Sequence, residues 1–356
     1  MTQVLRKDNV PSGLGAVDPH SKTGSNSQPM RGSHLGVTSS LDHITILWLK
    51  AGSTSIHGSM TNMLGITFDL SNPIGRRIGV WWDRCWSSVD GCLLSERDSA
   101  DGQVHCRLSI SGTACRRQTN MRLRGFMIWC NLNLFGLSCS RIDIAVDDFS
   151  KQLQLIELQG ACERGDYAGF RKCKSTINWG SKHNGWTVNL GSREGEKYIR
   201  IYDKFAESNG EIDSIRFEAE LSGDISNSLF KLILEFPQNE TEYQQELINY
   251  AVGTVSFLEK NDRNLSRNLL LKWWDDWLNY LKSCPKKVKV IRKKSSIQDK
   301  KDWIKRAVSK SMCLVKDALG EIKMAEFVCE ILIDAKLKYT NFDLMLLSDY
   351  RMINAC

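Results

Sequence analysis

The sequence predicts an α+β fold: a strongly curved antiparallel β-sheet with helices packed behind it, followed by a helical C-terminal region. Two observations carry this prediction. Up to about residue 221, short runs rich in β-branched and aromatic residues are separated by turn residues, which is typical of antiparallel strands. From Ser226 onward, apolar residues recur every three or four positions, which indicates amphipathic helices.

The expected strands follow one another along the first two thirds of the chain. They are HITILWLKA (43–51), LGITFDL (64–70), RRIGVWW (76–82), HCRLSIS (105–111), MRLRGFMIWCNLNLFG (121–136), RIDIAVDDF (141–149), WTVNLG (186–191), YIRIYDK (198–204) and IRFEAEL (215–221). One short helix is expected among them, over 153–162. The later helices are expected over 228–236, 241–252, 264–281, 303–318 and 321–337, and a final segment YTNFDLMLLSDY follows them.

This pattern divides the chain into four regions. Residues 1–40 are rich in Gly, Ser, Asn and Pro and lack periodic apolar positions, so they are expected to form a disordered polar arm. Residues 41–225 would form the catalytic domain, and 226–285 a helical extension packed on it. Residues 286–356 would form a basic, helical region for DNA recognition.

Charge is concentrated in the last region. The whole chain has a net charge of +7, which permits a nucleic-acid partner without demanding one. Residues 286–310 contain eleven lysines and arginines and only two aspartates, so this run alone has a net charge of +9. DNA-backbone contact is the favoured reading of this run over a solvated linker. Its candidate contacts are Lys286, Lys287, Lys289, Arg292, Lys293 and Lys294.

Composition also excludes some classes of protein. No stretch approaches about 18 consecutive apolar residues, so no membrane partner is expected. The N-terminus lacks the apolar segment of a secretory signal. The twelve cysteines are scattered without a C-x-x-C pair, so we expect reduced thiols in a cytoplasmic protein and no zinc site. No G-x-x-x-x-G-K-[ST] motif is present, which excludes a P-loop ATPase engine.

Three of the expected strands have one apolar face and one chemically functional face. Residues two apart lie on the same face of a strand, so each polar face can be read directly from the sequence. These faces contain Arg141, Asp143 and Asp147 on the first strand, Tyr198, Arg200, Tyr202 and Lys204 on the second, and Arg216, Glu218 and Glu220 on the third.

If the three strands are neighbours, their polar faces converge on one site. Clustered carboxylates suit Mg²⁺ or Mn²⁺, and arginines among them would hold a phosphate. A tyrosine in the same layer could attack a phosphodiester if its phenolate were stabilised. The competing interpretation is a half-exposed sheet whose outer face is simply solvated, and residue chemistry alone leaves both open.

The motifs RIDIAVDDF, GSREGEKYIRIYDKFAE and RFEAEL resemble the core motifs of the Rep_trans replication initiators. The resemblance covers roughly residues 41–222, and Asp42 matches the aspartate that usually opens the family's first strand. The overall layout is most similar to initiators of filamentous vibriophages. This implies a rolling-circle initiator of a filamentous phage, plasmid or other mobile element in a bacterial cytoplasm.

The resemblance also implies roles for individual residues. Tyr202 would be the nucleophile, which attacks one origin strand, stays joined to the 5′ phosphate and leaves a 3′-OH as primer. Tyr198 on the same face is the competing candidate. Arg200 and Arg216 would contact phosphate, helped by Lys204. The metal would be held by Asp143 and by Glu218 or Glu220, with Asp147 as a further candidate.

The same resemblance implies partners: origin DNA, a host helicase and a host polymerase, with a homodimer as a further expectation. No two of the six histidines are one residue apart, so the His-x-His metal site of other initiators is excluded. His183 is expected to be a bystander. Trp273, Trp274 and Trp277 are expected to pack in the core instead of stacking on bases.

Two other functions remain open at this point. One is a DNA-binding regulator that has the fold without the chemistry. The other is a metal-dependent nuclease that hydrolyses DNA without a covalent intermediate.

Overall fold

The structure is a computed structural model. The residues that it describes are 36–49, 54–74, 82–98, 102, 104–178, 185–290 and 296–353. His183, Arg292, Lys293 and Lys294 lie outside them.

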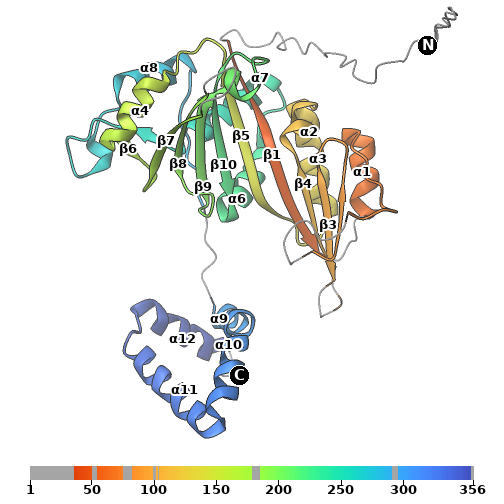
Figure 1. Cartoon of the computed structure of the whole chain (residues 1–356), viewed down its shortest axis with the longest axis vertical. Helices are drawn as coiled ribbons and strands as arrows, with labels where there is room; N and C mark the ends of the chain where they lie inside the picture. Colours follow the sequence, from red (N-terminus) through yellow and green to blue (C-terminus); the bar gives the residue numbers. More distant parts are fainter. Residues whose placement is uncertain are drawn as a thin grey trace, which may run out of the picture.

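A large antiparallel sheet dominates the chain (Figure 1). In the described ranges it has nine strands in the order β2-β3-β4-β1-β5-β10-β9-β8-β7. A second, small sheet pairs β11 with β6. The strands are β1 (Val37–Leu49), β2 (Arg84–Ser87), β3 (Leu93–Asp98), β4 (Val104–Ile110), β5 (Ser138–Asp148), β6 (Tyr167–Ala168), β7 (Cys173–Asn178), β8 (Gly185–Gly191), β9 (Lys197–Asp203), β10 (Ile215–Ser222) and β11 (Ser256–Phe257).

Helices fill the connections and cover one face of the sheet. They are α1 (Thr54–Leu64), α2 (Gly112–Arg116), α3 (Asn120–Asn133), α4 (Leu155–Arg164), α5 (Lys204–Glu207), α6 (Gly223–Glu235), α7 (Glu240–Val252), the 3-10 turn Leu265–Arg267, α8 (Lys272–Tyr280), α9 (Ile297–Trp303), the π-helical segment Ile304–Val308, α10 (Ser309–Leu319), α11 (Glu321–Lys336) and α12 (Asn341–Ile353). The predicted α+β fold with an antiparallel sheet is confirmed. In the described ranges, no helix is both long and apolar enough to span a membrane.

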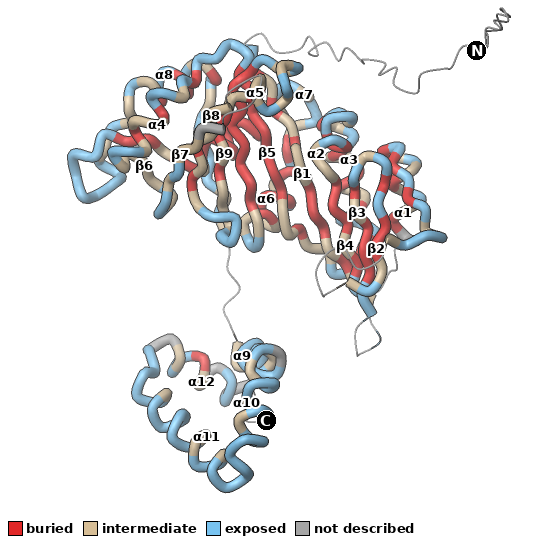
Figure 2. Tube along the Cα trace, viewed as in Figure 1, coloured by how far each residue is buried: buried red, intermediate tan, exposed pale blue. Residues whose placement is uncertain are grey.

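The core lies between the sheet and helices α3, α6 and α7. The α6 helix contacts β5 and β10, α7 contacts β1, β5 and β10, and α3 packs on α6 and α7. The sheet contributes the apolar residues of its alternating strands, including Ile144, Ile199 and Phe217, which are fully buried. Burial is continuous over 142–148 of β5 and 215–221 of β10, whereas β1 and β9 mix buried and half-buried residues (Figure 2). The opposite, polar face of the same strands is left for the site.

The C-terminal helices form a unit with little burial of its own. The α9 helix begins with a capping box at Ser296 and Asp299 and contacts α12, and α10 contacts α11. Lys300 of α9 pairs with Asp343 of α12 at 3.3 Å. Large apolar side chains on α11, such as Leu332, remain exposed.

Two of the expected strands are wrong. Of the strand expected over 121–136, residues 121–133 belong to helix α3, whose buried Leu123, Phe126, Met127 and Cys130 recur at helical spacing. Thr119 caps the first turn of this helix. Their β-prone composition was outweighed by this periodicity. Residues 65–70 follow the end of α1 and contain no strand, and 75–81 lie outside the described residues.

Two boundaries also differ from expectation. Strand β1 begins at Val37, inside the polar arm expected over 1–40, because residues 37–41 pair with β5. The single helix expected over 264–281 is broken, since Leu270 bridges to Leu258 and α8 begins only at Lys272. The tryptophans of α8 do pack in the core: Trp274 and Trp277 are fully buried against Phe217.

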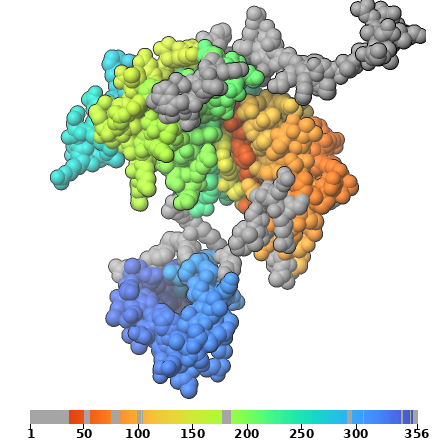
Figure 3. Space-filling model, in the orientation of Figure 1, coloured from red at the N-terminus to blue at the C-terminus, as the bar shows by residue number. Residues whose placement is uncertain are grey.

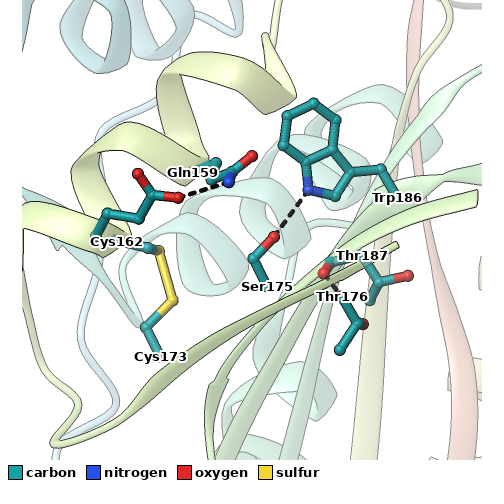
Figure 4. The surroundings of a disulfide bond; sticks show 8 residues. Gln159, Cys162, Cys173, Ser175, Thr176, Trp186 and Thr187 are labelled. Carbon is teal, nitrogen blue, oxygen red and sulfur yellow. Dashed lines mark hydrogen bonds between the residues drawn. A yellow bond between two sulfur atoms is a disulfide. The ribbon is translucent and has the colours of Figure 1, made fainter. Parts of the chain in front are cut away.

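A disulfide joins Cys162 of α4 to Cys173 of β7 (Figure 4). The two Cα atoms are 5.9 Å apart. The expectation of reduced thiols throughout is therefore wrong for this pair. The two cysteines are eleven positions apart in the sequence without a recognisable pairing motif, and the packing of α4 on β7 brings them together.

Candidate active site

Strand register places the predicted residues in rows across the polar face. Strands β5, β10 and β9 are direct neighbours, as the sequence analysis required. In one row, Asp143 is opposite Glu220, and Glu220 is opposite Tyr198. In another, Asp147 is opposite Arg216, and Arg216 is opposite Tyr202. Glu218 and Arg200 form the row between these two. The space-filling surface is hollowed along β1, beside these strands (Figure 3).

Tyr202 is buried, and its hydroxyl donates a hydrogen bond of 3.0 Å to Glu218 Oε2. Glu218 also accepts a hydrogen bond from Arg200. The Arg200 guanidinium lies 5.5 Å from the centre of the Tyr202 ring, and Lys204 Nζ lies 5.7 Å from it. Burial raises the pKa of Tyr202, and the Glu218 charge raises it further, against the opposing effect of Arg216. The free protein therefore holds this phenol protonated, with an acceptor in contact.

Arg216 is buried beneath this tyrosine and fully engaged by carboxylates. It donates to both oxygens of Asp147 at 2.7 Å and contacts Asp42 at 3.4 Å. Asp42 also pairs with Arg116 of α2 at 3.0 Å. Burial raises the pKa of Asp42, and the Arg216 charge lowers it. These contacts hold Arg216 in place and leave Asp147 turned toward it.

The other end of the polar face is built differently. Arg141 donates to both oxygens of Asp143, at 2.9 and 2.6 Å, and also lies 2.9 Å from Glu220 Oε2. This Glu220 oxygen is buried and receives no hydrogen bond, since the close Arg141 nitrogen is not aimed along a donor direction. Burial raises the pKa of Asp143 to about 7, although Arg141 opposes the shift.

These residues can be tested against the predicted divalent metal. Among the described residues, no three His, Cys, Asp or Glu side chains gather as a ligand set. Asp147 and Glu218 are turned to Arg216 and Arg200, and both oxygens of Asp143 accept from Arg141. Metal ligation by these carboxylates stays a prediction. Asp143 and Glu220 remain as a facing pair with an unbonded oxygen. Mg²⁺ is commonly held by one or two carboxylates plus substrate phosphate, so this pair fits it.

The candidate DNA-contacting lysines have different surroundings. Lys204 is buried, and its Nζ binds Glu207 at 2.5 Å. Lys286 pairs with Glu246 at 2.7 Å, while Lys287 and Lys289 are exposed on the segment that follows α8. Contact between DNA and these lysines stays a prediction.

Two site residues had no role derived from chemistry in the sequence analysis. The register of β1 against β5 shifts between Leu41 and His43, which marks a β-bulge. Because of this bulge, the consecutive residues Asp42 and His43 both lie on the polar face. His43 contacts Thr45 and Ser109 at 3.0 Å. Burial lowers its pKa to about 4, helped by Arg141 and Arg107, so its imidazole is neutral. Strict alternation could have found only one of the two.

Comparison with protein-family models shows which family the chain belongs to. Residues 138–332 match the family model Rep_trans, described as replication initiation factor. The chain belongs to this replication initiation factor family. The match begins at β5 and includes β9 and β10, so it contains all three polar strands. It omits β1 to β4 and extends into α11, whereas the motif resemblance was placed on roughly 41–222.

A solved structure supports the fold of this family member. The rolling circle replication initiator protein from Geobacillus stearothermophilus is similar with a TM-score of 0.53 and 16% sequence identity. The similarity covers 72% of this chain and 99% of that one. At this identity it shows the fold. No curated protein sequence matches the chain.

Proposed function

We propose that this chain initiates rolling-circle replication by nicking one strand of an origin and becoming joined to the new 5′ phosphate through Tyr202. The observation that carries the proposal is the hydrogen bond from the buried Tyr202 hydroxyl to Glu218. A phenol is a weak nucleophile until a base takes its proton. Here a carboxylate is already in contact with that proton.

The bonds that change can be assigned to residues of this chain. The Tyr202 phenolic oxygen forms a bond to phosphorus, its proton passes to Glu218, and the bond from phosphorus to the 3′ oxygen breaks. The departing 3′ oxygen takes a proton from water. When the DNA is rejoined, the 3′-OH gives its proton to solvent as its oxygen forms a bond to phosphorus. The bond from phosphorus to the Tyr202 oxygen breaks, and Glu218 returns the proton to Tyr202.

The cations around Tyr202 have two roles. Arg200 is partly exposed, and its Nε is buried without a hydrogen-bond partner, so it is suited to contact the scissile phosphate. Arg216 is held by Asp147 and Asp42, so it acts mainly by its fixed charge beneath the tyrosine. Asp143 and Glu220 would hold a divalent metal, which would supply Lewis-acid polarisation of the phosphate.

Tyr198 is the natural control for Tyr202. Its hydroxyl donates to Asn189 at 2.7 Å, and an amide oxygen is not a base that can keep the proton. Tyr202 therefore has the better acceptor, although Tyr198 is opposite Glu220 and nearer the proposed metal pair.

The test uses supercoiled plasmid that contains the genomic region encoding the protein, with Mg²⁺ or Mn²⁺ present. Wild-type protein and Tyr198→Phe should give a protein–DNA adduct that survives denaturation, and Tyr202→Phe should give none while still binding DNA. An adduct in Tyr202→Phe would contradict the assignment. Binding without any adduct would favour a non-catalytic regulator, and a free 5′ phosphate would favour a simple nuclease.

A further inference from the structure

The polar face continues beyond the proposed site, onto β1 and β4. Arg107 on β4 is opposite Leu47 of β1 and Ser95 of β3. Ser109 is two residues further along β4, so it lies on the same face as Arg107, and Thr45 of β1 is opposite it. Ser109 contacts both Thr45 and His43 by hydrogen bonds, which places His43 on this face as well. Arg107 therefore lies on the same side of the sheet as Tyr202, in a part of the chain that the family model does not match.

Arg107 is a half-buried cation without a counter-charge. Within the described parts of the chain, its side chain forms no ion pair and no hydrogen bond. Burial lowers the pKa of Arg107, with Cys85 opposing and the nearby Arg141 charge adding to the shift. The other arginines of the polar face, Arg141, Arg200 and Arg216, all pair with carboxylates. A lone arginine next to another guanidinium is unfavourable unless an anion joins it.

A second, independent feature marks the same spot. The Ser95 hydroxyl is fully buried and has no hydrogen-bond partner. Buried polar groups are rarely left unpaired in proteins. Ser95 and Arg107 are directly opposite each other on neighbouring strands, so an unpaired hydroxyl and an unpaired guanidinium share one site.

Arg107 and Tyr202 lie at opposite ends of a diagonal across the face. Four strand spacings and nine residues of register separate them, which is roughly 35 Å at about 4.8 Å per strand and 3.3 Å per residue. Arg141 lies between them. A stacked DNA strand rises about 3.4 Å per nucleotide, so the diagonal corresponds to about ten nucleotides.

We propose that Arg107 binds a backbone phosphate of the DNA strand that runs from Tyr202 across the sheet, about ten nucleotides from the cleaved bond. The planar guanidinium matches a phosphate with two parallel hydrogen bonds, and the Ser95 hydroxyl lies on the strand beside it. This inference rests on the proposed function, which places the cleaved bond at Tyr202 and so sets where the DNA strand starts. The contact between Arg107 and a phosphate can be measured without cleavage.

The experiment measures binding of full-length protein to fluorescein-labelled single-stranded dT30 by anisotropy over a series of salt concentrations. All proteins contain Tyr202→Phe, so nothing is cleaved. Arg107→Gln should weaken binding on the order of tenfold and reduce the slope of log K against log salt by about 0.7, the value for one phosphate on a single strand. The affinity of Arg107→Lys should lie between that of the protein with Arg107 and that of Arg107→Gln, because lysine retains the charge and loses the bidentate geometry.

The matched control is Arg263→Gln, which removes the same charge from the exposed loop before the 3-10 turn and should leave both quantities unchanged. Arg107→Gln should not lower Tm, since the side chain of Arg107 has no hydrogen-bond or ion-pair partner among the described residues. Unchanged affinity and slope, an equal loss in Arg263→Gln, or a lowered Tm without a binding defect would each overturn the proposal. If wild-type protein makes no adduct but Arg107→Gln still weakens dT30 binding, the proposed function fails and the phosphate site stands.

Discussion

The two ends of the polar face are built on different principles. At the nucleophile end, defined by Tyr202, Glu218, Arg216, Asp147 and Asp42, buried charges are matched by ion pairs or hydrogen bonds within the protein. The acidic end, defined by Tyr198, Asp143, Glu220 and Arg141, keeps a carboxylate oxygen without a hydrogen bond and an aspartate with a pKa of about 7.

This difference teaches how the site divides its tasks. At the nucleophile end, the tyrosine and the carboxylates already have partners before DNA arrives, which is the arrangement that favours catalysis. Arg200 keeps a buried Nε without a hydrogen-bond partner in the described residues. The acidic end has two carboxylates for one arginine, and that excess of negative charge is what a divalent cation would satisfy. Replacing matched residues at each end should therefore give different kinds of defect.

The largest difference is expected between the two glutamates of β10. Glu218→Gln removes the proton acceptor of Tyr202, and loss of a general base typically costs about 10²- to 10⁴-fold in rate. The single-turnover rate of adduct formation should fall by that factor and recover as pH rises, since hydroxide must then take the proton. Added Mn²⁺ should not restore it.

Glu220→Gln is the matched control for that measurement. It makes the same chemical change two residues along the strand, at the acidic end, and leaves the hydrogen bond between Tyr202 and Glu218 intact. Its rate should fall less and be partly restored by Mn²⁺. If Mn²⁺ restores both variants equally, the two ends do not differ in the way described.

The second largest effect is expected in the free energy of unfolding when a buried arginine of the nucleophile end is replaced. Arg216→Met leaves Asp147 buried beside an apolar side chain, while Asp42 keeps its pair with Arg116. Breaking a buried pair in this way costs about 3–5 kcal/mol. Urea unfolding should show this loss as a lower midpoint. The control is Arg267→Met, which removes an exposed arginine that lies 3.6 Å from the exposed Asp262. That surface site should cost about 0–1 kcal/mol, and equal losses would refute a preorganised nucleophile end.

The sequence could predict the strands of the site but not its pairings. Alternation in RIDIAVDDF, YIRIYDK and IRFEAEL separated the polar from the apolar face correctly, because a strand has a period of two whatever its neighbours. Which arginine neutralises which carboxylate depends on register, and register is set by long-range pairing. The sequence therefore could not show that Asp147 and Glu218 pair with arginines, and metal ligation by the predicted carboxylates stays a prediction.

Two further errors have local physical causes. Helix α3 was taken for a strand because Met, Leu, Phe, Ile and Trp crowd residues 121–129, although its buried positions recur at helical spacing. The bulge at Leu41 breaks the alternation of β1, so the roles of Asp42 and His43 could not be read from the pattern. Neither the bulge nor the disulfide has a sequence signal that a single chain reveals.

The smallest expected effect concerns pH and the acidic end alone. Asp143 keeps its proton up to about pH 7 in the folded protein, against a usual value of 3.8. Between these values the folded state binds more protons than the unfolded state, so the free energy of unfolding should fall as pH rises through the window. The total change is on the order of 2–4 kcal/mol, measured by urea unfolding in EDTA from pH 4.5 to 8.

Asp143→Asn should flatten this dependence, whereas Asp224→Asn, at an exposed carboxylate of α6, should leave it unchanged. A slope that survives in Asp143→Asn would mean that the strained carboxyl group lies elsewhere and that the acidic end is as well matched as the nucleophile end.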